Sequence, residues 1–341
     1  MRSSLFLTGV LGLALPISVL AQSAQTFSDI PASSTFHSAA EYLYANGIMS
    51  GYEEEGGKRT FRPDNKLNRA EAVKLIVTPL MQADELATFT KSVYSDVPAG
   101  SWFLSAVEAA RSKFGIIDYK ESDPRFKPTD PVLKGQFLKM FLLASGVDAK
   151  SLYSEIKLPL SIDAQGVSEW YYPFLRYAIA SSMTMVTQEG KFSLDRQLTR
   201  GDVALLIYRY EMYKEGRRTQ ALLSEAESEI VNVLQLMEAD NIVNAEYAAA
   251  RSLIAARGAL TSKPDEPLVK GAVKTAEGFQ TLTRAYRAGK DQKYQEVIQL
   301  TGDAWHLAEK AKAFSPSLTS VATQMQAIAK NMADQARELM K

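Results

Sequence analysis

The 341-residue sequence contains no cysteine and only two histidines. The absence of cysteine excludes a disulfide framework, thiolate metal ligands and a cysteine nucleophile. The histidines, His37 and His306, lie far apart in the chain, and neither has a second histidine at metal-ligand spacing. The sequence also lacks the Gly-x-Ser-x-Gly and phosphate-loop motifs. We therefore expect no cofactor, no metal site and no enzymatic activity.

The sequence has no excess of charge of either sign. It contains 39 lysines and arginines against 39 aspartates and glutamates, which gives a formal net charge of zero. A strongly basic surface is the usual electrostatic signature of nucleic-acid binding. The balanced charge therefore predicts that nucleic acid is not a partner.

Long apolar runs are also scarce, and the one clear example lies at the N-terminus. The run extends from Leu5 to Leu20, follows an arginine, and ends with small or short residues at Val19 and Ala21. This pattern predicts a secretory signal peptide over residues 1–21 and an exported protein. An N-terminal membrane anchor is the alternative, although the run is short for a membrane span.

The chain contains a three-fold internal repeat. The segments FRPDNKLNRAEAVKLIV, FKPTDPVLKGQFLKMFL and FSLDRQLTRGDVALLIY begin at Phe61, Phe126 and Phe192, which are 65 and 66 residues apart. Upstream, Phe-Ser-Asp ending at Asp29 opens the first copy and Tyr-Ser-Asp ending at Asp96 opens the second, while the third copy shows no clean opening. A fixed period of this length predicts three copies of one structural unit.

Each copy reads as helix, turn-rich loop, helix. The first helices are expected at about 34–46, 102–114 and 170–181, from apolar residues at helical spacing. For the second helices the predicted N-terminal caps are Asn68 with Glu71, Asp130 followed by Pro131, and Thr199 with Asp202.

The repeat resembles the S-layer homology family. The resemblance rests on the Phe-Ser-Asp openings, on Gly47-Ile48 and Gly115-Ile116 at the ends of the first helices, on the Phe-x-Pro loop, and on the Asn-Arg-Ala-Glu and Thr-Arg-Gly-Asp variants of the family motif. It implies a mainly α fold in which three helix–loop–helix repeats pack as a pseudo-threefold bundle, followed by a C-terminal α-helical bundle. The expected boundaries are 1–21 for the signal peptide, 22–85, 86–148 and 149–216 for the repeats, and 217–341 for the bundle.

The resemblance also implies a set of binding residues. In the family, the motif arginine sits at a helix start and faces a groove between repeats, where it recognises an acidic polysaccharide. Helix N-termini offer free N–H groups, and a guanidinium matches a carboxylate. The positions that carry over are Arg69, Arg200 and Lys134, with Asp29, Asp96 and Gly51 at other motif positions.

Several of these residues have structural alternatives. The two aspartates could instead cap the following helix, and Gly51 could serve a backbone conformation with positive φ. Trp102 and Trp170 could stack on sugar rings, but large aromatic residues at a helix start belong more often to the core.

The last third of the chain has the periodicity of long helices. We expect helices at about 219–238, 241–260, 266–288 and 291–313, and a last one after Pro316. The last helix has an apolar seam in steps of three or four residues, formed by Leu318, Val321, Met325, Ile328, Met332, Ala336 and Leu339. This seam predicts packing within the bundle, with self-association as the alternative.

These features predict an exported cell-surface protein. The repeats are expected to anchor it non-covalently to a secondary cell-wall polysaccharide, acidic or pyruvylated, or to peptidoglycan. Residues 217–341 are expected to serve as a helical spacer, or to bind a protein partner or a second copy. The alternatives are a wall-active enzyme anchored by the repeats, and an envelope tether whose helices bind a membrane or protein partner.

Overall fold

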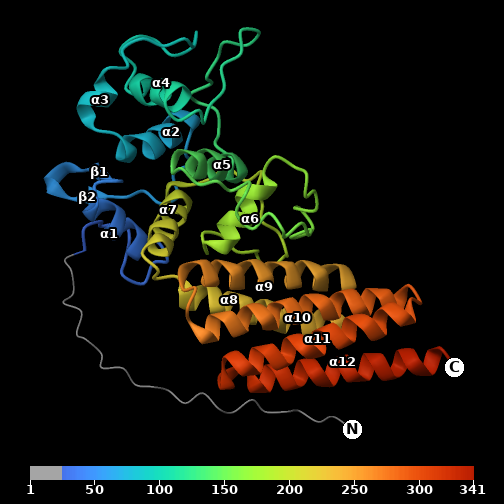
Figure 1. The fold of residues 1–341 in the computed structure, drawn as a ribbon. Helices are drawn as coiled ribbons and strands as arrows, with labels where there is room; N and C mark the ends of the chain where they lie inside the picture. The colour runs from blue at the N-terminus through green and yellow to red at the C-terminus, as the bar shows by residue number, and fades with distance from the viewer. Residues whose placement is uncertain (1–24) are drawn as a thin grey trace.

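A computed structural model describes residues 25–341, so the predicted signal peptide lies outside the described residues. The described chain is mainly helical, which confirms the predicted fold class (Figure 1). Its only sheet is a two-stranded antiparallel ribbon of β1 (Tyr52–Glu53) and β2 (Arg59–Thr60). Among the helices of residues 25–341, none combines the length and the apolar character that a membrane crossing requires.

Three helix–loop–helix units make up the first two thirds of the described chain. We call them repeats 1, 2 and 3; each has a first helix, a long loop and a second helix. Their helices are α1 (His37–Ala45) and α2 (Arg69–Val77), α4 (Leu104–Ser112) and α5 (Lys134–Ala144), and α6 (Tyr172–Ala180) and α7 (Arg200–Lys214). Three shorter helices are also present in this part of the chain: η1 (Glu55–Gly57), η2 (Thr78–Leu80) and α3 (Ala83–Ala87).

A closed ring of backbone hydrogen bonds joins the three repeats. In each repeat, one residue lies just before the N-cap of the second helix. Its N–H donates to the corresponding residue of one neighbouring repeat, and its carbonyl accepts from that of the other. Leu67 donates to Leu198 (3.0 Å), Leu198 donates to Val132 (3.1 Å), and Val132 donates to Leu67 (3.4 Å). All three side chains are buried, so the ring lies in the core. The cyclic order gives the pseudo-threefold arrangement.

An aspartate braces the loop of every repeat. The two carboxylate oxygens of Asp29 accept hydrogen bonds from the backbone N–H groups of Phe61 (2.8 Å) and Arg62 (2.6 Å). Asp96 does the same in repeat 2 and Asp163 in repeat 3. Repeat 3 therefore has the opening acid that the sequence analysis did not find. The second residue of each braced pair adopts a positive φ; these residues are Arg62, Lys127 and Ser193.

The start of α5 differs from the prediction. Asp130 was expected to cap it with Pro131 at the first helical position, but the helix begins at Lys134 after Leu133. The segment from Pro131 to Leu133 remains extended because it forms the ring, where backbone bridges hold it against both neighbouring repeats. The capping boxes predicted for α2 and α7 are both present.

Five long helices form the C-terminal bundle at the predicted positions. They are α8 (Thr219–Glu238), α9 (Ile242–Ser262), α10 (Pro267–Lys290), α11 (Tyr294–Phe314) and α12 (Thr319–Leu339), with η3 (Pro316–Leu318) before the last. The apolar seam of α12 packs within the chain on α10 and α11. Gly271 and Gly278 lie against Leu318 and Met325, and a Cβ at either glycine would overlap those side chains.

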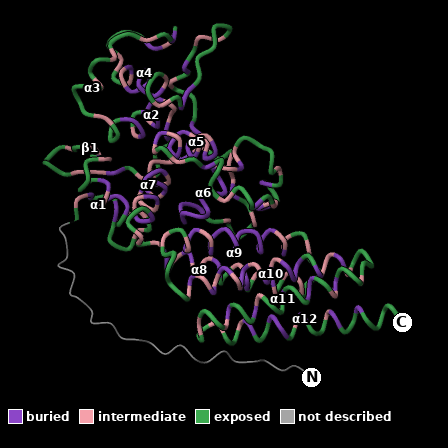
Figure 2. Tube along the Cα trace, viewed as in Figure 1, coloured by how far each residue is buried: buried purple, intermediate pink, exposed green. Residues whose placement is uncertain are grey.

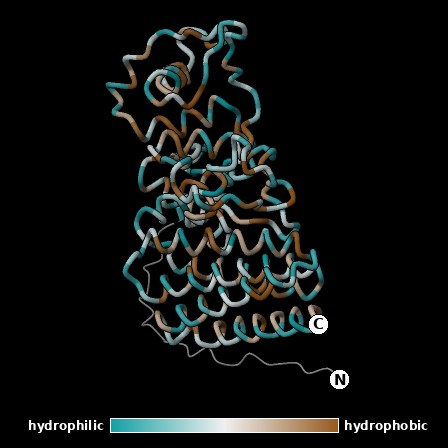
Figure 3. The backbone as a smooth tube through the Cα atoms, turned by 45° about the vertical axis from the view of Figure 1, so that its right-hand side comes forward, coloured by the Kyte–Doolittle hydropathy of each residue, from teal (hydrophilic) through white to brown (hydrophobic). Residues whose placement is uncertain are grey.

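Exposed residues line the outer side of α12 (Figure 2), and its path near the C-terminus is mostly hydrophilic or neutral (Figure 3). Its seam is therefore largely used within the bundle, although Leu339 at its end remains 65% exposed.

The bundle docks directly on repeat 3. Helix α9 runs alongside α6, and Gly258 approaches it so closely that a Cβ would overlap the carbonyl oxygen of Ala180. Tyr153 bonds to Thr261 (3.0 Å), and Arg251 of α9 donates to the carbonyl of Leu160 (2.7 Å). One continuous apolar cluster includes residues of all three repeats and of α8, α9 and α10. The two regions are therefore packed together rather than joined by a free linker.

Candidate functional site

The three predicted cations all lie between repeats. Each projects from the start of a second helix over the loop phenylalanine of the next repeat. The side-chain charge of Arg69 lies 5.1 Å from the ring centre of Phe126, that of Lys134 lies 5.9 Å from Phe192, and that of Arg200 lies 4.9 Å from Phe61. The three cation–aromatic contacts therefore join the three repeats in a closed cycle, as the three backbone hydrogen bonds do. We call the three sites the Arg69, Lys134 and Arg200 grooves.

At the helix starts beside these cations, most N–H groups are already bonded within the described chain, so the expected free helix N-termini are largely absent. In α2, the N–H of Arg69 bonds to the carbonyl of Asp130 (2.9 Å) and that of Ala70 to Pro128 (3.0 Å). The next two N–H groups bond to the side chain and carbonyl of Asn68. The first two positions of α5 and α7 are likewise bonded to neighbouring loops. At α2 and α7, where the first four N–H groups are all bonded, side chains are the groups available to a ligand.

The cations have no carboxylate partner. Within residues 25–341, Arg69, Lys134 and Arg200 form no ion pair within 4.0 Å. Burial lowers the pKa of each of the two arginine side chains. Burial, reinforced by the charge of Arg196, lowers the pKa of Lys134 to about 8. Each groove therefore holds a partly desolvated cation that lacks a counter-ion.

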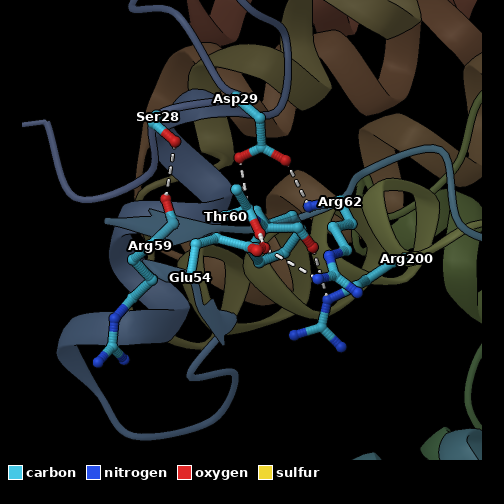
Figure 4. A network of polar contacts seen from close by, with 8 residues as sticks. Ser28, Asp29, Glu54, Arg59, Thr60, Arg62 and Arg200 are labelled. Carbon is cyan, nitrogen blue, oxygen red and sulfur yellow. Dashed lines mark hydrogen bonds and ion pairs between the residues drawn. The ribbon is translucent and has the colours of Figure 1, made fainter. Parts of the chain in front are cut away.

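In the Arg200 groove, the cation faces the loop of repeat 1 (Figure 4). Its Nε donates to the carbonyl of Phe61 (2.9 Å), which leaves the terminal nitrogens without a protein partner among the described residues. The ring of Tyr52 lies 5.0 Å from the guanidinium of Arg200 and 4.2 Å from that of Arg62. Arg62 is itself neutralised by Glu54 (2.8 Å). The unpaired charge of the groove therefore resides on Arg200.

In the Arg69 groove, the guanidinium makes no hydrogen bond within the described residues, and its buried Nε has no partner. One helical turn further along α2, the ammonium of Lys74 lies 5.0 Å from the ring centre of Trp102. Trp102 is 56% exposed, so its placement in the core was wrong. The groove thus combines an unpaired guanidinium with an open aromatic face.

The Lys134 groove is the most enclosed. Lys134 is 9% exposed, and its ammonium donates to the carbonyl of Phe192 (2.9 Å). A cavity of about 220 Å³ lies beside it, lined also by Arg196, Asp202 and Arg209. Arg196 and Asp202 pair at 2.7 Å, so they largely neutralise each other. As in the Arg69 groove, an exposed tryptophan lies at the edge: Trp170 is 52% exposed and faces Lys139 at 5.9 Å.

The other predicted site residues have structural roles. The carboxylates of Asp29 and Asp96 are occupied by loop backbone, as described above, and neither caps the helix that follows. Gly51 has a φ of +71°, and a Cβ there would overlap the ring of Phe27. These three residues shape the loops that form the grooves, but they present no free group to a ligand.

Sequence reasoning missed some contributors to the grooves. It placed the cations in grooves between repeats without indicating which loop faces each one, and the structure pairs each cation with the loop of the next repeat. Arg200 therefore meets the Gly-Ile loop of repeat 1, including Tyr52, which had not been singled out. Asp163 could have been found by spacing, since it lies 29 residues before its phenylalanine while Asp29 and Asp96 lie 32 and 30 residues before theirs.

Comparison with known proteins supports the resemblance. Residues 26–73, which include the loop of repeat 1 and the start of α2, match the profile of the S-layer homology domain. A curated relative is an amylopullulanase of Thermoanaerobacterium thermosulfurigenes, 24% identical over 184 residues. That match covers 54% of this chain but 9% of the relative. Over residues 26–73 the chain is therefore similar to the S-layer homology domain, and this likeness supports a place at the cell surface.

Proposed function

We propose that this protein is exported and that its three repeats anchor it to an acidic cell-wall polysaccharide through the grooves between them. The observation that carries the proposal is the set of three cations, each over an aromatic ring of the next repeat and each without a carboxylate partner in the described chain. A carboxylate or pyruvate ketal on a sugar supplies the missing charge, and a guanidinium binds such a group through two parallel hydrogen bonds.

The two arginine grooves are the main contact sites in this proposal. Both have nitrogens with no protein partner among the described residues, whereas the ammonium of Lys134 is already bonded and nearly buried. Trp102 and Trp170 offer exposed rings on which the apolar face of a sugar can stack. Acidic groups of the polymer would thus bind the cations while neighbouring sugar rings bind the tryptophans.

The test is co-sedimentation of the purified protein with cell walls, before and after removal of the secondary polysaccharide. We expect binding to be lost on removal. We expect Arg69→Ala and Arg200→Ala each to weaken it by about 10-fold, the cost of one charged hydrogen-bonded contact. Arg284→Ala, an exposed arginine of α10 without an ion pair in the described chain, is the matched control. Retention on stripped walls would indicate peptidoglycan instead, and unchanged binding by the double variant would refute the groove assignment.

For the helical bundle, we propose the role of a rigid extension that carries no catalytic activity. Its support is the docking of α9 on repeat 3 through Gly258. Small-angle scattering of the whole protein should then fit one compact arrangement, and a broad distribution of sizes would exclude a rigid extension. Incubation with wall polysaccharide should release no reducing ends; release would favour the wall-active enzyme.

A further inference from the structure

A second cleft lies where repeat 3 meets the bundle, and it shares Thr184, Met185 and Val186 with the cavity beside Lys134. Its volume is about 950 Å³. One wall comes from Ile162 and the loop 184–190 of repeat 3, and the other from α8 and α9. Ligand sites of this size occur preferentially between domains. Neither the family match, which ends at residue 73, nor the groove mechanism assigns a role to this cleft.

The buried charges of the cleft are already paired. Arg251 bonds to both carboxylate oxygens of Glu229 (2.7 Å each). Glu225 accepts a hydrogen bond from Ser182 and faces Arg218 at 3.6 Å. The remaining lining charge, Glu189, lies in an exposed loop. A charged ligand would therefore find no unpaired buried counter-charge here, in contrast to the grooves.

Several uncharged polar side chains of the cleft are available for hydrogen bonding. Ser224, Ser228 and Gln235 lie along one edge of α8 over about 16 Å, and their side chains make no hydrogen bond within residues 25–341. Tyr247 and Thr184 also line the cleft. Most of each residue is buried, but neither hydroxyl oxygen is among the buried side-chain atoms that lack a partner. Both hydroxyl groups therefore reach the solvent of the cleft, where they can donate to or accept from an uncharged ligand.

The facing wall carries exposed apolar side chains among polar residues. Ile162 and Met185 line it and are 45% and 47% exposed, which is unusual for large aliphatic side chains beside a core. A ligand that fits must therefore have apolar faces and a rim of uncharged donors and acceptors. Pyranose rings have this chemistry, since their C–H faces are apolar and their hydroxyl and acetamido groups project from the edge.

We propose that this cleft binds a neutral oligosaccharide. The faces of its sugar rings pack on Ile162 and Met185, and its hydroxyl groups bond to the polar edge of α8. The proposal does not rest on the groove function, because it takes a neutral ligand and uses none of the three groove cations, although Met185 also lines the cavity beside Lys134. The chain would then hold a neutral and an acidic saccharide at two separate places.

The experiment is calorimetric titration of the whole protein with tri-N-acetylchitotriose, a neutral probe. We expect saturable binding. Ser228→Trp fills the cleft from an exposed position of α8 and should weaken binding at least 10-fold. Gln220→Trp places the same side chain at an exposed position of α8 outside the cleft, and it should leave the affinity within 2-fold. Circular dichroism of both variants checks that the helices remain folded.

Other results would overturn the proposal. It fails if the wild type does not bind the probe, or if Ser228→Trp binds it as well as Gln220→Trp does. Binding that is lost in the Arg69→Ala/Arg200→Ala variant but kept in Ser228→Trp would place the saccharide in the grooves. A neutral peptide, acetyl-trialanine amide, is titrated in parallel, and preference for it over the saccharide would also refute the assignment. If the wild-type protein binds chitotriose but does not sediment with cell walls, only the proposed groove function is refuted.

Discussion

Arg251 of the bundle and the groove cations of the repeats have opposite environments. In the bundle, Arg251 is 8% exposed, and all its nitrogens are bonded to Glu229 and to the carbonyl of Leu160. In the repeats, Arg69 has a buried Nε without a partner, and Lys134 is bonded only to a carbonyl. A desolvated charge without a counter-ion destabilises a fold. The contrast teaches that Arg251 is part of a paired structural contact, whereas Arg69 and Lys134 lack the counter-ion that our proposal assigns to a ligand.

The largest effect is expected from removing the bundle counter-ion. Glu229→Ala leaves Arg251 charged and buried, and it should lower the free energy of unfolding by about 3–5 kcal/mol. Urea denaturation followed by circular dichroism measures this change. Glu246→Ala breaks the more exposed pair with Arg287 and should cost at most about 1 kcal/mol. Equal losses in the two variants would show that Arg251 is not an interior ion-paired cation.

The next effect concerns the anions of the repeats, which bind backbone rather than cations. Asp29→Ala removes two charge-assisted hydrogen bonds to the loop of repeat 1, and it should lower the free energy of unfolding by about 2–3 kcal/mol. Asp64→Ala, at an exposed position of the same loop, is the control and should change it by less than about 0.5 kcal/mol. If both substitutions are equally mild, the aspartate does not brace the loop.

A smaller effect should appear as a pH dependence. Lys134 has a folded-state pKa of about 8 because burial disfavours its charge, against an ordinary value of 10.5. Between these values the unfolded chain binds more protons, so stability rises with pH in this window. From pH 7.5 to 9.5 the wild type should gain about 1–2 kcal/mol relative to Lys134→Met. Parallel stability curves for the two proteins would mean that Lys134 titrates normally.

The smallest effect on stability is expected at Arg69. Arg69→Met keeps an apolar side chain on Phe126 and removes a desolvated charge, so the free energy of unfolding should change by less than about 1 kcal/mol or should rise. Wall binding by the same variant should still fall. A loss above about 2 kcal/mol would make Arg69 a structural cation like Arg251, and the contrast between the two regions would disappear.

Much of the fold could be predicted because it depends on local patterns. The apolar periodicity predicted every bundle helix within a few residues, and the capping residues Asn68 and Thr199 marked the starts of α2 and α7. The start of α5 could not be predicted in this way. Pro131 is well suited to a first helical turn, but the ring draws its segment into an extended conformation through hydrogen bonds to distant residues.

The candidate site was predicted in part. Motif positions identified Arg69, Lys134 and Arg200, and the structure brings each of them to a boundary between repeats. A motif cannot show what else a group already bonds. The helix N–H groups and the carboxylates of Asp29 and Asp96 had suitable chemistry for a ligand, but the neighbouring loops occupy them. The sequence also could not show exposure. Trp102 and Trp170 are of a residue type that is usually found in the core, but both lie on the surface.

The closed ring formed by Leu67, Val132 and Leu198 sets this repeat architecture apart from a solenoid. In a solenoid, each repeat contacts only its neighbours, so copies can be added at either end and terminal copies need special caps. Here every copy bonds to both others, and no copy is terminal. A fourth copy has no free edge to join. The number of copies is therefore fixed by geometry at three, so divergence can alter the side chains of one groove but cannot shorten or extend the array.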